Sequence, residues 1–376
     1  MELSPAGDGG TPADRAVVRR PPEVEFADEL AALAAADEHA RPPGWRLSPR
    51  AVRSFIVGAD DDALERPIAR KLYGDDALVE RAIVTLTGTR ALLLVGEPGT
   101  AKSMLSELLA AAISGTSAHT IQGTAGTTED HIKYSWNYAL LLAQGPSREA
   151  LVPSPLYRGL EQGLIVRFEE VTRCPPEIQD TLVSVLSDKV LHVPELGDDA
   201  VVPARRGFNL IATANTRDRG VHEMSAALKR RFNFETVPPI ADPQLELQLV
   251  KEQAGRLLAE AEAEVEVPDD VLELLVTTFQ DLRTGRTAEG TVIDSPSTVL
   301  STAEAVSVAF AASLDARYFG SGRLEPRHLV SQLLGTVIKD REEDLRKLRQ
   351  YFDVVVKTRG SRSRLWRSYY RARKVL

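Results

Sequence analysis

The sequence predicts an α/β fold, in which a phosphate-binding domain with a parallel sheet precedes a smaller, helical domain. Strand-like apolar runs alternate with helical patterns as far as about residue 239. One of these runs, 91–95, leads through a glycine-rich turn into a helical pattern. After Pro238-Pro239 the periodicity is almost entirely helical. We expect residues 46–239 to form the α/β domain and residues 240–350 the helical one.

The glycine-rich turn is Gly96-Glu97-Pro98-Gly99-Thr100-Ala101-Lys102-Ser103. Between a buried strand and a helix, the backbone N–H groups of such a turn cradle phosphates. We expect Lys102 to reach the β- and γ-phosphates of a nucleotide and the Ser103 hydroxyl to bind Mg²⁺. Ala101 stands where glycine usually precedes the lysine, and we expect it to lie already in the helix, where a methyl group is tolerated. The alternative is an ordinary tight turn that carries Lys-Ser.

Composition sets limits on the class of protein. A chain of 376 residues, 43% apolar and 27% charged, is long enough for two globular domains. The net charge of −8 argues against a dominant nucleic-acid surface, although a local one is compatible with it. One cysteine, Cys174, excludes an internal disulfide. Because the sequence shows neither a signal-peptide pattern nor a bilayer-spanning run, we expect a cytoplasmic protein without a membrane partner.

Both ends of the chain differ from its middle. Residues 1–45 are expected to be a disordered tail that is helical in part, over Phe26–Ala36. Residues 351–376 are expected to be a basic tail, with seven basic residues and no acid from Arg359 onward. Trp366, Tyr369 and Tyr370 lie among these residues, so the tail can bind nucleic acid or dock on an acidic surface. The stretch 123–161 is expected to be irregular: either a solvated loop or one that contacts a partner or a pore.

Two carboxylates follow the apolar strand expected at 163–168. Glu169 can bind the coordination shell of the Mg²⁺ ion. Glu170 can orient and deprotonate the water that attacks the γ-phosphate. Such a pair is often only a solvated turn, but its place at a strand end after a phosphate loop favours the catalytic interpretation.

Two further candidates follow the strand expected at 208–214. Asn215, at its end, can hydrogen-bond the attacking water or the γ-phosphate. Arg230 and Arg231 end the helix expected at 224–232 and can neutralise charge on the phosphate bound by a neighbouring subunit. Their alternative role is to complement the dipole of that helix.

Four elements in this order make the chain resemble MoxR-like AAA+ ATPases: residues 96–103, 168–170, 214–216 and 228–232. The resemblance implies a parallel sheet of order 5-1-4-3-2, a helical lid, and a ring, usually a hexamer, with ATP and Mg²⁺ at the subunit interfaces. It assigns Glu170 as the catalytic glutamate, Asn215 as the first sensor and Arg231 as the arginine finger. It also implies remodelling or maturation of a partner protein, often one with a von Willebrand A domain.

Two positions depart from the family pattern. Glu169 replaces the usual aspartate. Ser297 follows Ser295-Pro296 where a lid arginine is usual, and either Arg283 or Arg286 is an alternative source of that charge. We expect a Mg²⁺-dependent ATPase that remodels a protein. Two alternatives stay open: a nucleic-acid motor, since 215–219 resembles McrB-type subunits, and a nucleotide-gated scaffold with little hydrolysis.

Overall fold

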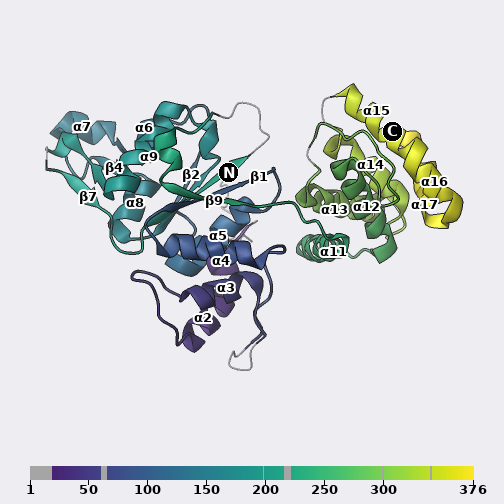
Figure 1. Ribbon diagram of the computed structural model, residues 1–376, viewed down its shortest axis with the longest axis horizontal. Coiled ribbons are helices and arrows are strands. Elements are labelled where there is room, and N and C mark those ends of the chain that lie inside the picture. The colour runs from purple at the N-terminus through teal and green to yellow at the C-terminus, as the bar shows by residue number, and fades with distance from the viewer. Residues whose placement is uncertain (1–18, 61–65, 198, 216–221, 299, 339–340) are drawn as a thin grey trace, which may run out of the picture.

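The computed structural model describes residues 19–60, 66–197, 199–215, 222–298, 300–338 and 341–376. Within these ranges an α/β domain and a C-terminal helical domain form two bodies, which the segment after strand β9 connects (Figure 1). The helices so described are all too short or too polar to cross a bilayer. Residues 1–18 and 216–221 lie outside these ranges, and with them the first part of the expected N-terminal tail and most of the stretch that resembles McrB.

The α/β domain is built on a five-stranded parallel sheet of order β2-β5-β8-β1-β9. Its strands are β1 (Ala91–Gly96), β2 (Thr120–Gln122), β5 (Ile165–Glu169), β8 (Asn209–Asn215) and β9 (Phe232–Thr236). Counted along the chain and read from the β9 edge, this is the order 5-1-4-3-2, as expected. The register pairs Gly96 with Asn215. The phosphate loop and the candidate sensor therefore meet at the carboxyl edge of the sheet, where ligands bind in open α/β folds.

The two faces of the sheet belong to two apolar cores. Leu92 and Leu94 of β1 join the core with α3 (Pro49–Val57), α4 (Asp76–Thr87) and α5 (Lys102–Ser114), whereas Ala91 and Leu93 join the core on the other face with α9 (Pro176–Asp188). This alternation explains why the strand reads as an uninterrupted apolar run. Two short helices, α1 (Pro22–Glu25) and α2 (Ala27–Ala36), precede α3.

The stretch 123–161 is more regular than expected. It contains α6 (Glu129–Ile132), β3 (Tyr134–Trp136), α7 (Tyr138–Gln144), β4 (Leu151–Pro153) and the start of α8 (Pro155–Gln162). Strands β3 and β4 pair antiparallel, and every residue of α7 is at least partly exposed. A second hairpin, β6 (Val190–His192) and β7 (Val201–Pro203), follows α9, and α10 (Ala226–Lys229) precedes β9.

The helical domain begins with α11 (Pro243–Glu260) and α12 (Asp269–Thr284). It continues with α13 (Thr302–Phe319), α14 (Pro326–Thr336), α15 (Glu342–Tyr351), α16 (Lys357–Arg362) and α17 (Arg364–Ala372). Helix α13 begins at Thr302 because Ser301 and Glu304 form a capping box there.

The C-terminal residues differ from the separate basic tail that was expected. Tyr369 is fully buried in the same core as α12 and α13. Arg359 pairs with Asp281 at 2.7 Å and with Glu289 at 2.7 Å, and its guanidinium lies 4.8 Å from the centre of the Trp366 ring. The Tyr369 ring is therefore part of the core of the helical domain and is not free to stack on a base, and the partly buried Trp366 ring lies against Arg359.

Candidate nucleotide site

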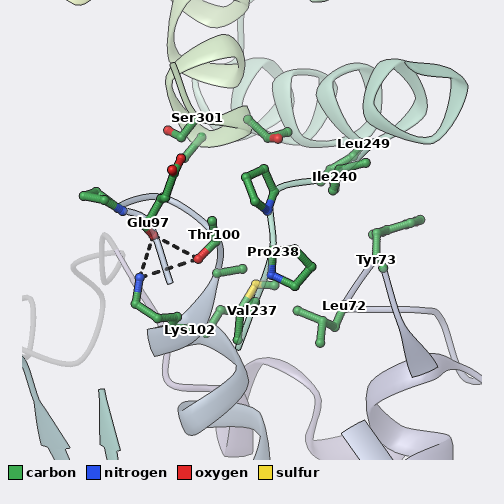
Figure 2. A pocket seen from close by; sticks show the side chains of 18 of the residues that line it. Leu72, Tyr73, Glu97, Thr100, Lys102, Val237, Pro238, Ile240, Leu249 and Ser301 are labelled. Carbon is green, nitrogen blue, oxygen red and sulfur yellow. Dashed lines mark hydrogen bonds between the residues drawn. The ribbon is translucent and has the colours of Figure 1, made fainter. Parts of the chain in front are cut away.

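A cavity of about 750 Å³ lies between the phosphate loop and the helical lid (Figure 2). Residues 97–104 form one wall, and Glu170, Thr213 and Asn215 lie at the strand ends. The linker after β9 and the start of α13 close the cavity from the lid side. The structure thus brings the expected phosphate loop, catalytic glutamate and first sensor together around one space.

The phosphate loop approaches the lid and the linker so closely that two of its positions require glycine. A Cβ atom on Gly99, whose φ is +76°, would lie 2.3 Å from the Ser301 hydroxyl oxygen. A Cβ atom on Gly96 would lie 2.4 Å from the carbonyl oxygen of Val237. Both contacts are far inside van der Waals distance, so the motif glycines permit the close packing of loop, linker and lid.

Ala101 does not lie in the helix, which corrects our expectation. Helix α5 begins at Lys102, and Ala101 precedes it in the left-handed region, at φ 65° and ψ 21°. This conformation costs a residue with a Cβ atom about 1–2 kcal/mol. Glu170 shares it, at φ 54°. Among the described residues only four non-glycine positions have positive φ, and two of them line this cavity, as strained residues at functional sites often do.

Lys102 is buried, and its ammonium group lies on the loop itself. It donates a hydrogen bond to the carbonyl oxygen of Glu97 at 2.6 Å (Figure 2). It donates another to the carbonyl oxygen of Gly96 at 3.2 Å. A bound phosphate would offer this group a charged partner in place of neutral carbonyls, and charge-assisted hydrogen bonds are roughly twice as strong as neutral ones.

Glu169 is 5% exposed and accepts four hydrogen bonds. Ser103 and Thr213 donate to Oε2, both at 2.7 Å, while Ser106 at 2.7 Å and Arg167 at 2.8 Å donate to Oε1. Burial alone would raise the pKa of Glu169, but the Arg167 charge and the three hydroxyl donors hold it below its ordinary value. The carboxylate is therefore ionised and joined directly to the phosphate loop through Ser103.

These oxygens suit Mg²⁺, which prefers hard oxygen ligands and usually keeps several waters. Within the described ranges no three His, Cys, Asp or Glu side chains cluster as a metal site. Ser103 and Glu169, which a hydrogen bond joins, are a donor set that fits an ion completed by nucleotide phosphates and water.

Glu170 and Asn215 line the cavity at the sheet edge. The backbone N–H of Glu170 donates to the Thr213 hydroxyl at 2.9 Å, and its carboxylate pairs with Arg173 at 3.1 Å. Among the described residues that line the cavity, neither Arg230 nor Arg231 is found. Arg231 instead donates to the Ser187 hydroxyl and the Ala227 carbonyl, both at 2.9 Å. A phosphate contact by either arginine would have to reach a neighbouring subunit.

The two candidates for a lid arginine differ in position. Arg283 lines the cavity, whereas the described lining does not include Arg286. Arg283 is already engaged: it pairs with the fully buried Glu246 at 2.7 Å and donates to the carbonyl oxygens of Leu300 at 3.0 Å and Ile240 at 3.2 Å. Ser297 points to Asp344 instead, with its hydroxyl 2.6 Å from the carboxylate.

Sequence reasoning missed Arg167, Ser106 and Thr213. One signal was present for Arg167, since it is a charged residue inside an otherwise apolar strand, two positions before a carboxylate. Residues i and i+2 of a strand share a face, so this spacing predicts contact between Arg167 and Glu169. Ser106 and Thr213 carry no comparable signal because serine and threonine are common in helices and strands.

Comparison with known proteins agrees with this geometry. Residues 91–232 match the family described as AAA domain (dynein-related subfamily), and residues 244–376 match the YehL-like AAA+ ATPase C-terminal domain. Protein YehL of Escherichia coli (strain K12) is 54% identical over 364 residues, which cover 96% of this chain and 99% of that one. The chain belongs to the YehL-like AAA+ ATPases.

This YehL-like ATPase is also similar to the chaperone MoxR1 of Mycobacterium tuberculosis, with 27% identity over 57% of this chain and 52% of MoxR1. The resemblance to MoxR-like AAA+ ATPases is confirmed. Among solved structures, NtrX from Brucella abortus in complex with ATP aligns with 82% of this chain and 69% of that one, at 14% identity and a TM-score of 0.49.

Proposed function

We propose that this YehL-like protein hydrolyses ATP in a Mg²⁺-dependent reaction at the cavity between phosphate loop and lid. The observation that carries the proposal is the hydrogen bond between Ser103 and Glu169, with Glu170 lining the same cavity. It joins the two halves of a nucleotide hydrolase, the loop that holds phosphates and the strand end that supplies carboxylates.

Each of these residues has a separate role in the in-line attack of water on the γ-phosphate. Lys102 and the loop N–H groups bind the phosphates, and Glu170 and Asn215 orient the water, with Glu170 accepting its proton. Bound Mg²⁺ would neutralise charge on the β- and γ-phosphates from the side of Ser103 and Glu169. Arg231, and with it Arg230, would stabilise transition-state charge at the site of a neighbouring subunit.

We propose that hydrolysis takes place in a cytoplasmic ring, usually a hexamer in this family, and drives remodelling of a protein partner. MoxR1 is a chaperone, and the similarity to it supports a protein substrate. A von Willebrand A domain is the partner class that the family resemblance implies. A nucleic-acid partner is disfavoured because Trp366 and Tyr369 pack within the lid.

A nucleotide-gated scaffold is the second candidate, and the lid supports it. Arg283 is neutralised by Glu246, and Ser297 is turned toward Asp344. The lid therefore lacks, among its described residues at the cavity, an arginine whose charge is uncompensated. Such a protein would bind ATP and assemble but hydrolyse it slowly.

Steady-state hydrolysis, measured against protein concentration with and without Mg²⁺, tests the proposal. We expect specific activity to rise with concentration, to need Mg²⁺ and to ignore added single-stranded DNA or RNA. Glu170→Gln should bind ATP but lose at least about 100-fold in turnover, whereas the exposed control Glu177→Gln should not. Full activity of Glu170→Gln would refute the assignment of Glu170 as the general base. ATP-dependent assembly without turnover in the wild type would favour the scaffold.

A further inference from the structure

The Glu169 carboxylate is held from two sides. Its Oε2 accepts from Ser103 and Thr213, at the phosphate loop, and its Oε1 accepts from Ser106 and Arg167, behind it. We propose that Arg167, with Ser106, is a positioning residue that holds Oε1 away from the metal, so that Oε2 alone serves Mg²⁺ beside Ser103. This inference rests on the proposed nucleotide site.

Local geometry places the two clamping groups. Arg167 and Glu169 lie two residues apart on β5 and so share a face of the strand. Ser106 lies one helical turn after Ser103 on α5, so both hydroxyls point toward that face. The Arg167 Nε donates to the Ser106 hydroxyl at 2.8 Å, which links the two donors to Oε1 into one unit.

The arginine is itself fixed. It is 5% exposed and also donates to the Ser117 carbonyl at 3.2 Å and the Thr120 hydroxyl at 3.1 Å, while Glu107 lies 3.3 Å from it. The planar guanidinium thus makes contacts in several directions at once, which a lysine cannot reproduce.

The hydrogen bonds from Arg167 and Ser106 to Oε1 explain how a glutamate can stand at position 169, where the family usually has aspartate. Glutamate has one more rotatable bond, so its carboxylate is free to turn and offer both oxygens to a metal. Mg²⁺ requires nearly ideal octahedral geometry, and two oxygens of one carboxylate lie too close together for adjacent octahedral positions. Fixing Oε1 on Arg167 and Ser106 restores the single-oxygen geometry that a shorter side chain provides.

Binding of a fluorescent ATP analogue, with Mg²⁺ and with EDTA in its place, tests this role separately from turnover. For Arg167→Met we expect the affinity with Mg²⁺ to fall about tenfold or more, while the affinity in EDTA stays within about twofold. Arg167→Lys should recover part of the Mg²⁺-dependent affinity, since lysine keeps the positive charge but lacks the planar guanidinium group with its several donors. Ser106→Ala should shift the affinity in the same direction, by about threefold.

Arg359→Met is the matched control, a half-buried, ion-paired arginine in the lid. This variant should lower the stability of the protein without changing the ratio of the nucleotide affinity with Mg²⁺ to the nucleotide affinity in EDTA. Equal losses with Mg²⁺ and in EDTA for Arg167→Met, or an unchanged ratio, would overturn the proposal. If Arg167→Met does not fold, Ser106→Ala decides by the same criterion. Absence of ATP binding by the wild type would instead refute the proposed function.

Discussion

The phenol of Tyr73 donates a 2.5 Å hydrogen bond to Glu252, and this bond joins the nucleotide domain to the lid. Tyr73 lines the cavity just before α4, while Glu252 lies on α11. A second link, the 2.8 Å ion pair of Glu25 with Arg256, connects the N-terminal helix α1 to the same lid helix. Two side-chain bonds to α11 therefore attach the lid to the nucleotide domain and to α1.

The Tyr73 bond should give stability that disappears at high pH. Burial and the bond to Glu252 raise the pKa of Tyr73 from its ordinary value of 10 to about 12. A raised pKa means that this contribution is fully present below pH 10 and is lost as the pH rises to 12. Tyr73→Phe should therefore lower the melting temperature at pH 8, and the difference from the wild type should vanish between pH 10 and 12. A difference that stays constant over this range would contradict the assignment.

Ala101→Gly should not destabilise the protein, although it removes a methyl group at the start of a helix. Glycine relieves the left-handed strain, and we expect a gain of up to about 1 kcal/mol in the free energy of unfolding. Ala31→Gly, on the exposed face of α2, should cost about 1 kcal/mol because it loosens a helix interior. Thermal unfolding of both variants checks this, and equal losses would show that Ala101 is unstrained in solution.

Arg231→Ala should abolish hydrolysis in a pure assembly but complement an inactive partner. Mixed with Glu170→Gln subunits, it should recover part of the activity, since some interfaces then combine an intact Glu170 with an intact Arg231. Ser187→Ala, which removes only the hydroxyl that holds Arg231, should retain most of the activity. No recovery at any mixing ratio would exclude a role in trans.

Replacing each of two adjacent tyrosines with alanine should lower the free energy of unfolding by very different amounts. Tyr369 is fully buried in the lid core, so Tyr369→Ala should cost about 3–5 kcal/mol, as for other large core side chains. Tyr370 is half-buried and bonds Asp353 at 3.1 Å, so Tyr370→Ala should cost about 1 kcal/mol or less. Denaturant unfolding of the full chain measures both. Equal, small costs would mean that the C-terminal helices do not belong to the lid core.

Local patterns in the sequence determined the α/β class, the strand order implied by the family resemblance, and the phosphate loop. The reason is that each pattern depends on its immediate surroundings: a run such as 91–95 is typical of a strand buried on both faces, and a glycine-rich turn before Lys-Ser is typical of a phosphate-binding loop. The acids at the end of β5 were predicted for the same reason, since parallel strands end at one edge.

Contacts between distant segments were decided only by the tertiary structure. The left-handed backbone of Ala101 depends on how the loop meets α5, and the burial of Tyr369 depends on a lid core assembled from helices more than 80 residues apart. Ser106 and Thr213 reach Glu169 from a helix and from a neighbouring strand, and no spacing along the chain encodes that convergence. The sequence alone thus predicted which groups would supply the chemistry, and the packing of the elements decided how each group is held.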